Sequence, residues 1–252
     1  MSKVVYEKSR GLTDNPLSYC PGCAHGIIHK IVADTLVSLD VLEKTIAIAP
    51  VGCSVMGYEY FNCDGIQAGH GRAPAVATGV KRTNPDKIVF TYQGDGDLAA
   101  IGAAEIVHAA HRGENITVIF VNNAIYGMTG GQMAPTTLID MKTSTSPFGR
   151  AETGTGKPLL VSEMLAQIPS ATYIERVSIH DVPNINKTKK AVKKAFQNQI
   201  DGRGFSMVEI LSTCPIGWNK TPTDALKFVQ TNMVPYFPLG VYADRFSEEV
   251  DG

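Results

Sequence analysis

A strand, a glycine turn, a helix and a second strand follow one another directly in the first half of this chain. Lys87–Tyr92 is a run of β-branched and aromatic residues, and the glycine-rich segment Gly94–Asp97 follows closely. Apolar residues at helical spacing occupy Leu98–Arg112, and Ile116–Val121 is a second apolar run. Continuous apolar strands joined by a helix are typical of a parallel sheet that helices cover on both faces. The sequence therefore predicts an α/β fold.

The flanking segments extend this pattern. We expect helices at His25–Leu39 and Lys187–Gln199, and strands at Thr45–Ala49, Thr172–Ser178 and Ser206–Leu211. The segment after residue 214 is rich in proline and holds the only tryptophan. We therefore divide the chain into an α/β domain, residues 1–214, and an extended C-terminal arm, residues 215–252, that we expect at a subunit interface.

Charge and hydropathy exclude several classes of protein. The formal net charge is −1 and no basic stripe is visible, so we expect no nucleic-acid partner. No apolar run reaches the roughly 18–20 residues that cross a bilayer, so we expect no association with membranes. The N-terminus lacks the apolar core of a signal peptide, and we expect a cytoplasmic protein.

The glycine turn has the features of a diphosphate site. Asp95 lies at the carboxyl end of a predicted strand, which is where open α/β sheets bind ligands. Glycines let the backbone approach phosphate oxygens, and the following helix directs its N-terminus at the anion. Asn122 and Asn123 end the next strand, with 25 residues between them and Gly96. Carboxylate and amide oxygens suit Mg²⁺, so this edge predicts a magnesium-bound diphosphate rather than an ordinary turn with a solvated Asp95.

Four cysteines form a second set. Cys20 and Cys23 are two residues apart, a spacing used by redox pairs, zinc sites and iron–sulfur clusters. Cys53 and Cys214 each follow a predicted strand, so both are expected at the edge that carries the glycine turn. Four thiols assembled from distant segments suit a [4Fe–4S] cluster. Cys63 is expected to be a small buried side chain.

With these motifs the chain resembles the β subunit of 2-oxoacid:ferredoxin oxidoreductases over residues 15 to 240. The segments that carry the resemblance are "CPGC", "APVGCS", "HGRAPAVATG", "TYQGDGDLAAIG", "NNAIYGMTGGQMAPTT" and "LSTCP". The resemblance implies a thiamine diphosphate-binding fold. It also implies that this subunit binds the diphosphate half of the coenzyme and carries an iron–sulfur cluster beside it.

The resemblance also implies a set of ligands. Mg²⁺ would be held by the side chains of Asp95 and Asn123 and by the carbonyl of Ile125. The implied ligands of the [4Fe–4S] cluster are Cys20, Cys23, Cys53 and Cys214. The residues expected to contact the coenzyme are Gly52, Cys53, Ser54, His70, Gly94, Asp95, Gly96, Asp97, Asn122, Asn123, Ile125, Met128, Thr129 and Gly130.

The implied reaction is oxidative decarboxylation of a 2-oxo acid with coenzyme A, giving acyl-CoA and CO₂ and passing electrons through the cluster to ferredoxin. No catalytic residue is assigned, although His70 is a candidate with a loop-ordering role as its equal alternative. Neither Glu59 nor Glu105 has the context of the glutamate that activates the coenzyme. We therefore expect that glutamate from an α subunit, and further clusters in a ferredoxin-like δ subunit, alongside a γ subunit.

The sequence leaves alternatives open for the substrate and for the class of protein. Relatives that act on 2-oxoglutarate often have a lysine where this chain has Gly130, and the neighbouring Met128 offers no charge. A branched-chain substrate, 2-oxoisovalerate, is favoured over 2-oxoglutarate and pyruvate. A non-oxidative thiamine diphosphate decarboxylase or carboligase subunit would explain the glycine turn but leave the cysteines unused. A zinc-stabilised scaffold without catalysis is the second alternative.

Overall fold

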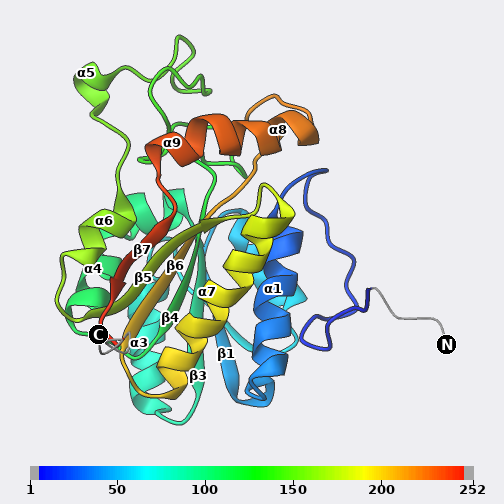
Figure 1. Cartoon of the computed structure of the whole chain (residues 1–252), viewed down its shortest axis with the longest axis vertical. Helices are drawn as coiled ribbons and strands as arrows, with labels where there is room; N and C mark the ends of the chain where they lie inside the picture. Colours follow the sequence, from blue (N-terminus) through cyan, green and yellow to red (C-terminus); the bar gives the residue numbers. More distant parts are fainter. Residues whose placement is uncertain (1–5, 247–252) are drawn as a thin grey trace, which may run out of the picture.

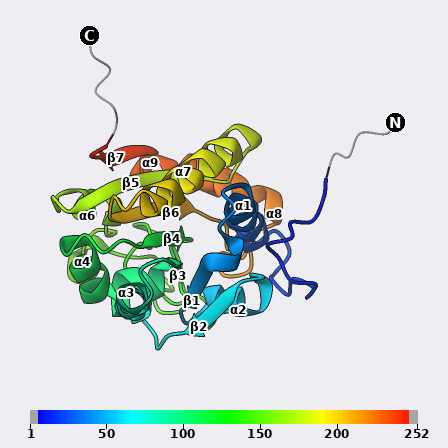
Figure 2. The same ribbon diagram turned by 90° about the horizontal axis from the view of Figure 1, so that it is seen from below.

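The structure is a computed structural model that describes residues 6–246. Within this range a seven-stranded sheet has the strand order β2-β1-β3-β4-β6-β5-β7 (Figures 1 and 2). Neighbouring strands run parallel, except that β7 is antiparallel to β5. The strands are β1 (Thr45–Ala49), β2 (Asp64–Gln67), β3 (Ile88–Gly94), β4 (Thr117–Asn122), β5 (Ala171–Ser178), β6 (Phe205–Leu211) and β7 (Gly240–Asp244).

Helices cover both faces of this sheet, which confirms the predicted α/β fold (Figure 2). Helices α1 and α7 pack on one face, and α3, α4 and α6 pack on the other. The helices are α1 (His25–Ser38), α2 (Gly57–Tyr60), α3 (Ala73–Thr83), α4 (Ala103–His111), α5 (Glu152–Thr155), α6 (Val161–Ala166), α7 (Val182–Ile200), α8 (Pro222–Phe228) and α9 (Val234–Tyr236). In the described residues no helix is both long and apolar enough to pass through a bilayer.

The central strands supply both hydrophobic cores because successive side chains point to opposite faces of a sheet. Phe90 and Ile119 belong to the core beneath α1 and α7. Their neighbours Val89 and Val118 belong to the core beneath α3 and α4. Strands buried on both faces read as unbroken apolar runs, which is why the sequence located them to within one or two residues.

The helix predicted at Leu98–Arg112 is divided in the structure. A wide π-helical turn, Gly96–Ile101, comes first, and α4 begins only at Ala103. At the junction the backbone of Gly102 lies against Gly71. A Cβ added to Gly102 would be 2.5 Å from the Gly71 carbonyl oxygen. Single π-turns inside helices are frequent at functional sites, and this one directly follows Asp95.

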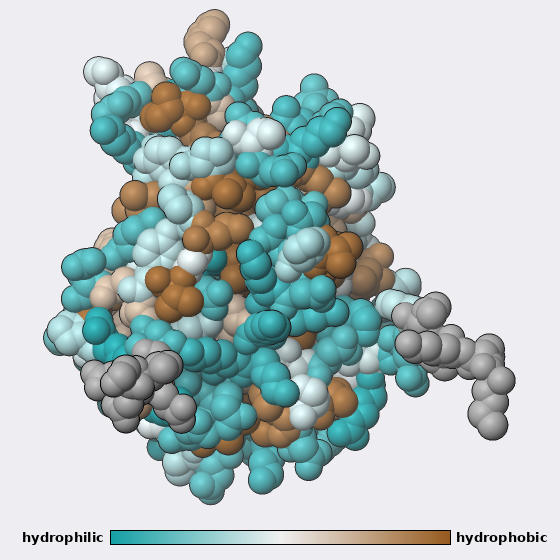
Figure 3. Space-filling model, in the orientation of Figure 1, coloured by the Kyte–Doolittle hydropathy of each residue, from teal (hydrophilic) through white to brown (hydrophobic). Residues whose placement is uncertain are grey.

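The segment after residue 214 differs from the predicted extended arm. It forms α8, a π-turn (Val229–Met233), α9 and strand β7. Pro222 starts α8 rather than keeping the chain extended, and the side chain of Thr221 caps that helix by accepting from the N–H of Asp224. Its apolar residues make a third core with Ile125 and Leu211. In the space-filling view several apolar patches surface just below α8 and α9 (Figure 3). A role for this segment at a subunit interface stays a prediction.

Candidate cofactor site

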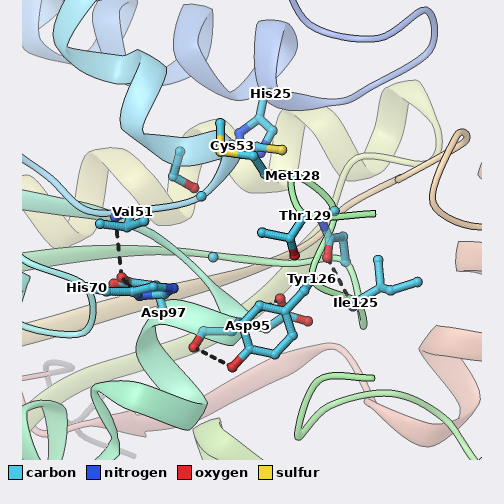
Figure 4. Close-up of a pocket in the computed structure, with 16 residues that line it drawn as sticks. His25, Val51, Cys53, His70, Asp95, Asp97, Ile125, Tyr126, Met128 and Thr129 are labelled. Atoms are coloured by element: carbon cyan, nitrogen blue, oxygen red, sulfur yellow. Dashed lines mark hydrogen bonds and ion pairs between the residues drawn. The ribbon is translucent and has the colours of Figure 1, made fainter. Parts of the chain in front are cut away.

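A cavity opens at the carboxyl ends of β1, β3 and β4 (Figure 4). Its lining residues are His25, Val51, Gly52, Cys53, Ser54, His70, Gly94, Asp95, Gly96, Asp97, Asn123, Ile125, Tyr126, Gly127, Met128 and Thr129. The cavity therefore gathers every residue predicted to contact the coenzyme except Asn122 and Gly130.

Asp95 is a buried carboxylate that faces this cavity from the end of β3. Its oxygens accept hydrogen bonds from the hydroxyl of Thr136 at 2.6 Å and from the N–H of Gly96 at 2.9 Å. Burial raises the pKa of Asp95 to about 7, although these bonds and one from the N–H of Ile125 act in the opposite direction. No cationic side chain of residues 6–246 forms an ion pair with it. A divalent cation would favour the charged form, so Asp95 fits a metal ligand.

The loop after β4 carries Asn123 to the same cavity. Ala124 has a positive φ of 59°, which turns the chain sharply at the strand end. The Asn123 side-chain oxygen accepts from the N–H of Ile125 at 3.2 Å, and the indole of Trp218 donates to the Asn123 carbonyl at 3.0 Å. The Thr137 hydroxyl donates to the Ala124 carbonyl at 2.6 Å. The turn is thus fixed from three segments, with one amide oxygen and the backbone of Ile125 beside Asp95.

Asn122 lies outside the cavity, unlike the prediction. Its amide donates to Glu209 at 2.8 Å, and its oxygen accepts from the N–H of Ala124 at 3.1 Å. Glu209 in turn accepts from the fully buried guanidinium of Arg176 at 2.9 Å. Asn122 therefore belongs to a buried ionic network behind the site. Gly130 also lies outside, in a turn with a φ of 106°.

Asp97 lines the cavity and also joins the loop of His70 and Gly71 to the end of β3. One oxygen accepts from Nδ1 of His70 at 2.6 Å and from the N–H of Gly71 at 2.8 Å. The other accepts from the amide of Gln93 at 2.6 Å. Figure 4 shows His70 and Asp97 together at one side of the cavity. Because Nδ1 is engaged, Nε2 of His70 is the nitrogen left for a ligand.

Three residues that support the site were not singled out from the sequence. The ring of Tyr126 lies so close to Gly96 that no Cβ would fit there, and its hydroxyl donates to the Gly96 carbonyl. Thr136 donates to Asp95, and Gln93 donates to Asp97. All three lie within the quoted motifs, but only their contacts in the structure show what they do.

A second cavity adjoins the first and is lined by Cys20, Cys23, Cys53 and Cys214. The two cavities share a wall, formed by His25, Cys53, Asn123, Gly127 and Met128. All five cysteines are free thiols. The fifth, Cys63, is outside both cavities, half-buried against the main core. Among the described residues, no group of three or more His, Cys, Asp or Glu side chains is arranged to hold a metal ion.

Burial and backbone N–H groups act in opposite directions on two of these thiols. Burial raises the pKa of Cys23 to about 11 and that of Cys214 to about 12, with backbone N–H groups of His25 and Gly217 acting against it. A Cβ added to Gly127 would lie 3.2 Å from the Cys214 sulfur, and a Cβ added to Gly217 would lie 2.8 Å from it. Glycine at both positions leaves room around the sulfur. A bound iron site would keep these thiols deprotonated.

Known proteins have sequences similar to this chain over the segments that form this site. A model of the thiamine pyrophosphate enzyme C-terminal TPP-binding domain matches residues 50–210. Ketoisovalerate oxidoreductase subunit VorA of Methanothermobacter marburgensis is 46% identical over 97% of this chain. The chain spans only 51% of that relative's length. The 2-oxoglutarate synthase subunit KorB of Methanocaldococcus jannaschii is 35% identical, with 94% of this chain and 84% of KorB covered.

A solved structure agrees with these relatives. The 2-oxoglutarate:ferredoxin oxidoreductase from Magnetococcus marinus, with 2-oxoglutarate, coenzyme A and succinyl-CoA bound, superposes with a TM-score of 0.76. Its sequence is 28% identical, and the match covers 92% of this chain and 83% of that one. Family model, sequence and fold point the same way, and the chain belongs to the thiamine diphosphate-dependent 2-oxoacid:ferredoxin oxidoreductase subunits.

Proposed function

We propose that this chain binds the diphosphate half of thiamine diphosphate in an enzyme that oxidatively decarboxylates a 2-oxo acid. Coenzyme A would take the acyl group, and ferredoxin would take the electrons. The observation that carries the proposal is the wall shared by the two cavities, with Asp95 on one side and four thiols around the other. Such an arrangement places a coenzyme site next to an electron acceptor site. A non-oxidative enzyme would not need the second site.

The oxygen donors at the first cavity suit Mg²⁺. Asp95 and Asn123 would hold the ion with their side chains, and Ile125 with its carbonyl. The N–H groups at the start of the π-turn, next to Gly96, would face the diphosphate. When bound, thiamine diphosphate supplies the carbanion chemistry, while the protein binds, orients and shields it.

The thiols at the second cavity suit a [4Fe–4S] cluster held by Cys20, Cys23, Cys53 and Cys214. A four-iron cluster is larger than a single ion, so its ligands stand around a cavity. Free thiols throughout the chain fit a reducing compartment, which supports the cytoplasm as its location.

The glutamate that activates the coenzyme is proposed to come from an α subunit. Neither Glu59 nor Glu105 lines the cavity. Glu105 forms an ion pair with Arg72, and Glu59 accepts from the hydroxyl of Tyr58. Relatives are named as subunits, so further chains are expected. We propose γ and ferredoxin-like δ subunits or their equivalents, with ferredoxin as acceptor.

A branched-chain 2-oxo acid is the proposed substrate. Met128 and Thr129 bring a thioether and a hydroxyl to the cavity, and no lysine or arginine of the described chain lines it. A second carboxylate, as in 2-oxoglutarate, would find no cation on this side. The 46% identity to a ketoisovalerate oxidoreductase subunit, against 35% to a 2-oxoglutarate synthase subunit, points the same way.

The proposal is tested on protein purified without oxygen together with its partner subunits. We expect about four irons per copy of this chain in addition to those that a δ subunit holds, visible absorption near 400 nm, and reduction of a viologen dye that depends on coenzyme A and is fastest with 2-oxoisovalerate. Zinc in place of iron would favour the scaffold, and decarboxylation without dye reduction would favour the non-oxidative enzyme. A faster reaction with 2-oxoglutarate or pyruvate would change the substrate alone.

Two variants and one control separate the two cavities. Asn123→Ala should lose magnesium-dependent binding of thiamine diphosphate and keep its iron. Cys214→Ser should lose iron or bleach, while Cys63→Ser, which changes the one cysteine outside both cavities, should keep it. Equal iron contents in all three proteins would remove Cys214 from the ligand set.

A further inference from the structure

His25 occupies the wall between the two cavities. It is the first residue of α1, two positions after Cys23, and it is only 2% exposed. Its backbone N–H approaches the Cys23 sulfur, while its imidazole lines the coenzyme cavity as well as the thiol cavity. Figure 4 places His25 and Cys53 at one end of the first cavity, away from Asp95.

Tyr92 fixes which ring nitrogen of His25 carries the hydrogen. The Tyr92 hydroxyl lies 2.7 Å from Nδ1 of His25. Tyr92 is 1% exposed, and its hydroxyl makes no other hydrogen bond within residues 6–246. If Nδ1 carried the hydrogen, the buried phenol would have no acceptor for its own, so we assign the phenol as donor to Nδ1 and place the imidazole hydrogen on Nε2.

The orientation of the imidazole is held from its other side. The ring of Tyr19 stacks on His25 with centroids 4.7 Å apart and an interplanar angle of 17°. The Tyr19 hydroxyl is itself held, at 2.9 Å from Nε2 of His29 and 3.2 Å from the Cys53 carbonyl. Within the described chain Nε2 of His25 has no hydrogen-bond partner, and it is not fully buried. It therefore opens onto the cavities.

We propose that the Nε2–H of His25 donates a hydrogen bond to a sulfur of the cluster and raises its reduction potential, with Tyr92 as the positioning residue. This inference rests on the proposed function, since it needs the cluster in the thiol cavity. A reduced cluster carries one more negative charge than an oxidised one, so a donor at its sulfur stabilises the reduced state more. One electron enters the cluster from the coenzyme side, and His25 keeps its proton throughout.

The test compares three variants with the wild-type holoenzyme, isolated without oxygen. His25→Leu removes the donor at similar volume, His25→Gln keeps an N–H donor, and Tyr92→Phe leaves the imidazole but frees its tautomer. The midpoint potential of the cluster is measured by redox titration followed by electron paramagnetic resonance, and pulsed spectra record exchangeable protons coupled to the reduced cluster. Iron content is determined for each protein.

We expect His25→Leu to shift the potential to a more negative value and to lose one exchangeable-proton coupling. His25→Gln should restore most of the wild-type potential, and Tyr92→Phe should shift it in the same direction as His25→Leu but less. A wild-type potential in His25→Leu, or equal shifts in His25→Leu and His25→Gln, would overturn the inference while leaving the proposed function intact. If His25→Leu loses its iron, the inference is tested by Tyr92→Phe alone. A wild-type potential in Tyr92→Phe would then overturn it. A wild-type holoenzyme with no cluster bound to this chain would end both proposals.

Discussion

Replacing Asp95 by asparagine should make the protein without coenzyme more stable at pH 8 than the wild type. The pKa of Asp95 is raised from 3.8 to about 7 by burial. At about 1.4 kcal/mol per pH unit, keeping this carboxylate charged in the folded state costs about 4 kcal/mol above pH 7. Asparagine removes that cost but weakens the bonds from Thr136 and Gly96, a loss of about 1–3 kcal/mol. The net gain should be about 1–3 kcal/mol.

The sign of the pH dependence is part of this prediction. Below pH 3.8 the carboxyl is protonated in both the folded and the unfolded states, so it contributes no penalty. Between pH 3.8 and about 7 the folded state holds the proton more tightly, so the wild type loses stability as pH rises. The advantage of Asp95→Asn should therefore shrink as the pH is lowered from 8 to 5. With saturating Mg²⁺ and thiamine diphosphate the wild type should be more stable than Asp95→Asn, because the wild type alone binds them.

Urea unfolding at pH 5 and pH 8, with and without the coenzyme, measures these differences. Asp97→Asn is the matched control, since Asp97 is equally buried but already accepts from His70, Gly71 and Gln93. That variant should be less stable than the wild type at pH 8. An Asp95→Asn protein that is less stable than the wild type at pH 8 without coenzyme would show that Asp95 is not under electrostatic strain.

Three further substitutions have defined outcomes. Gly96→Ala places a methyl group against the Tyr126 ring and should weaken coenzyme binding about tenfold or more in calorimetry, a loss of about 1.4 kcal/mol or more. Gly217→Ala brings a carbon within 2.8 Å of the Cys214 sulfur and should lower the iron retained after gel filtration; unchanged iron would mean that the sulfur has room to move. Arg176→Met leaves two carboxylates without their cation and should lower the free energy of unfolding by about 3–5 kcal/mol in urea titrations, whereas a loss below 1 kcal/mol would show that the network is not strongly stabilising.

The five inner strands and the residues at the carboxyl edge of the sheet were predictable because each depends on local sequence, whereas the mostly exposed edge strands β2 and β7 were not predicted. Strand β1 has the bounds predicted for Thr45–Ala49, since a short apolar run buried on both faces leaves little ambiguity. The predicted helix Lys187–Gln199 begins five residues earlier, at Val182, because Asp181 caps it with its side chain and Pro183 suits the first turn. Both capping signals are present in the sequence.

Other features depend on contacts between distant segments, which spacing does not reveal. Asn122 and Asn123 are identical neighbours, yet one turns to Glu209 and the other to the cavity. Which asparagine faces the cavity depends on the turn at Ala124 and on Glu209, which lies 87 positions after Asn122. The donation from Thr136 to Asp95 spans 41 positions in the same way. Residues that hold a site in place were harder to find than the residues that face it.

The hydrogen bond from Trp218 to the Asn123 carbonyl gives the protein a natural optical probe. Trp218 is the only tryptophan in the chain, so fluorescence excited selectively at indole comes from a single position. That position is 8% exposed and is attached to the turn that carries the proposed magnesium ligands. Loading of the metal and coenzyme can thus be followed in real time by stopped-flow emission from the unmodified chain, without a label and without turnover.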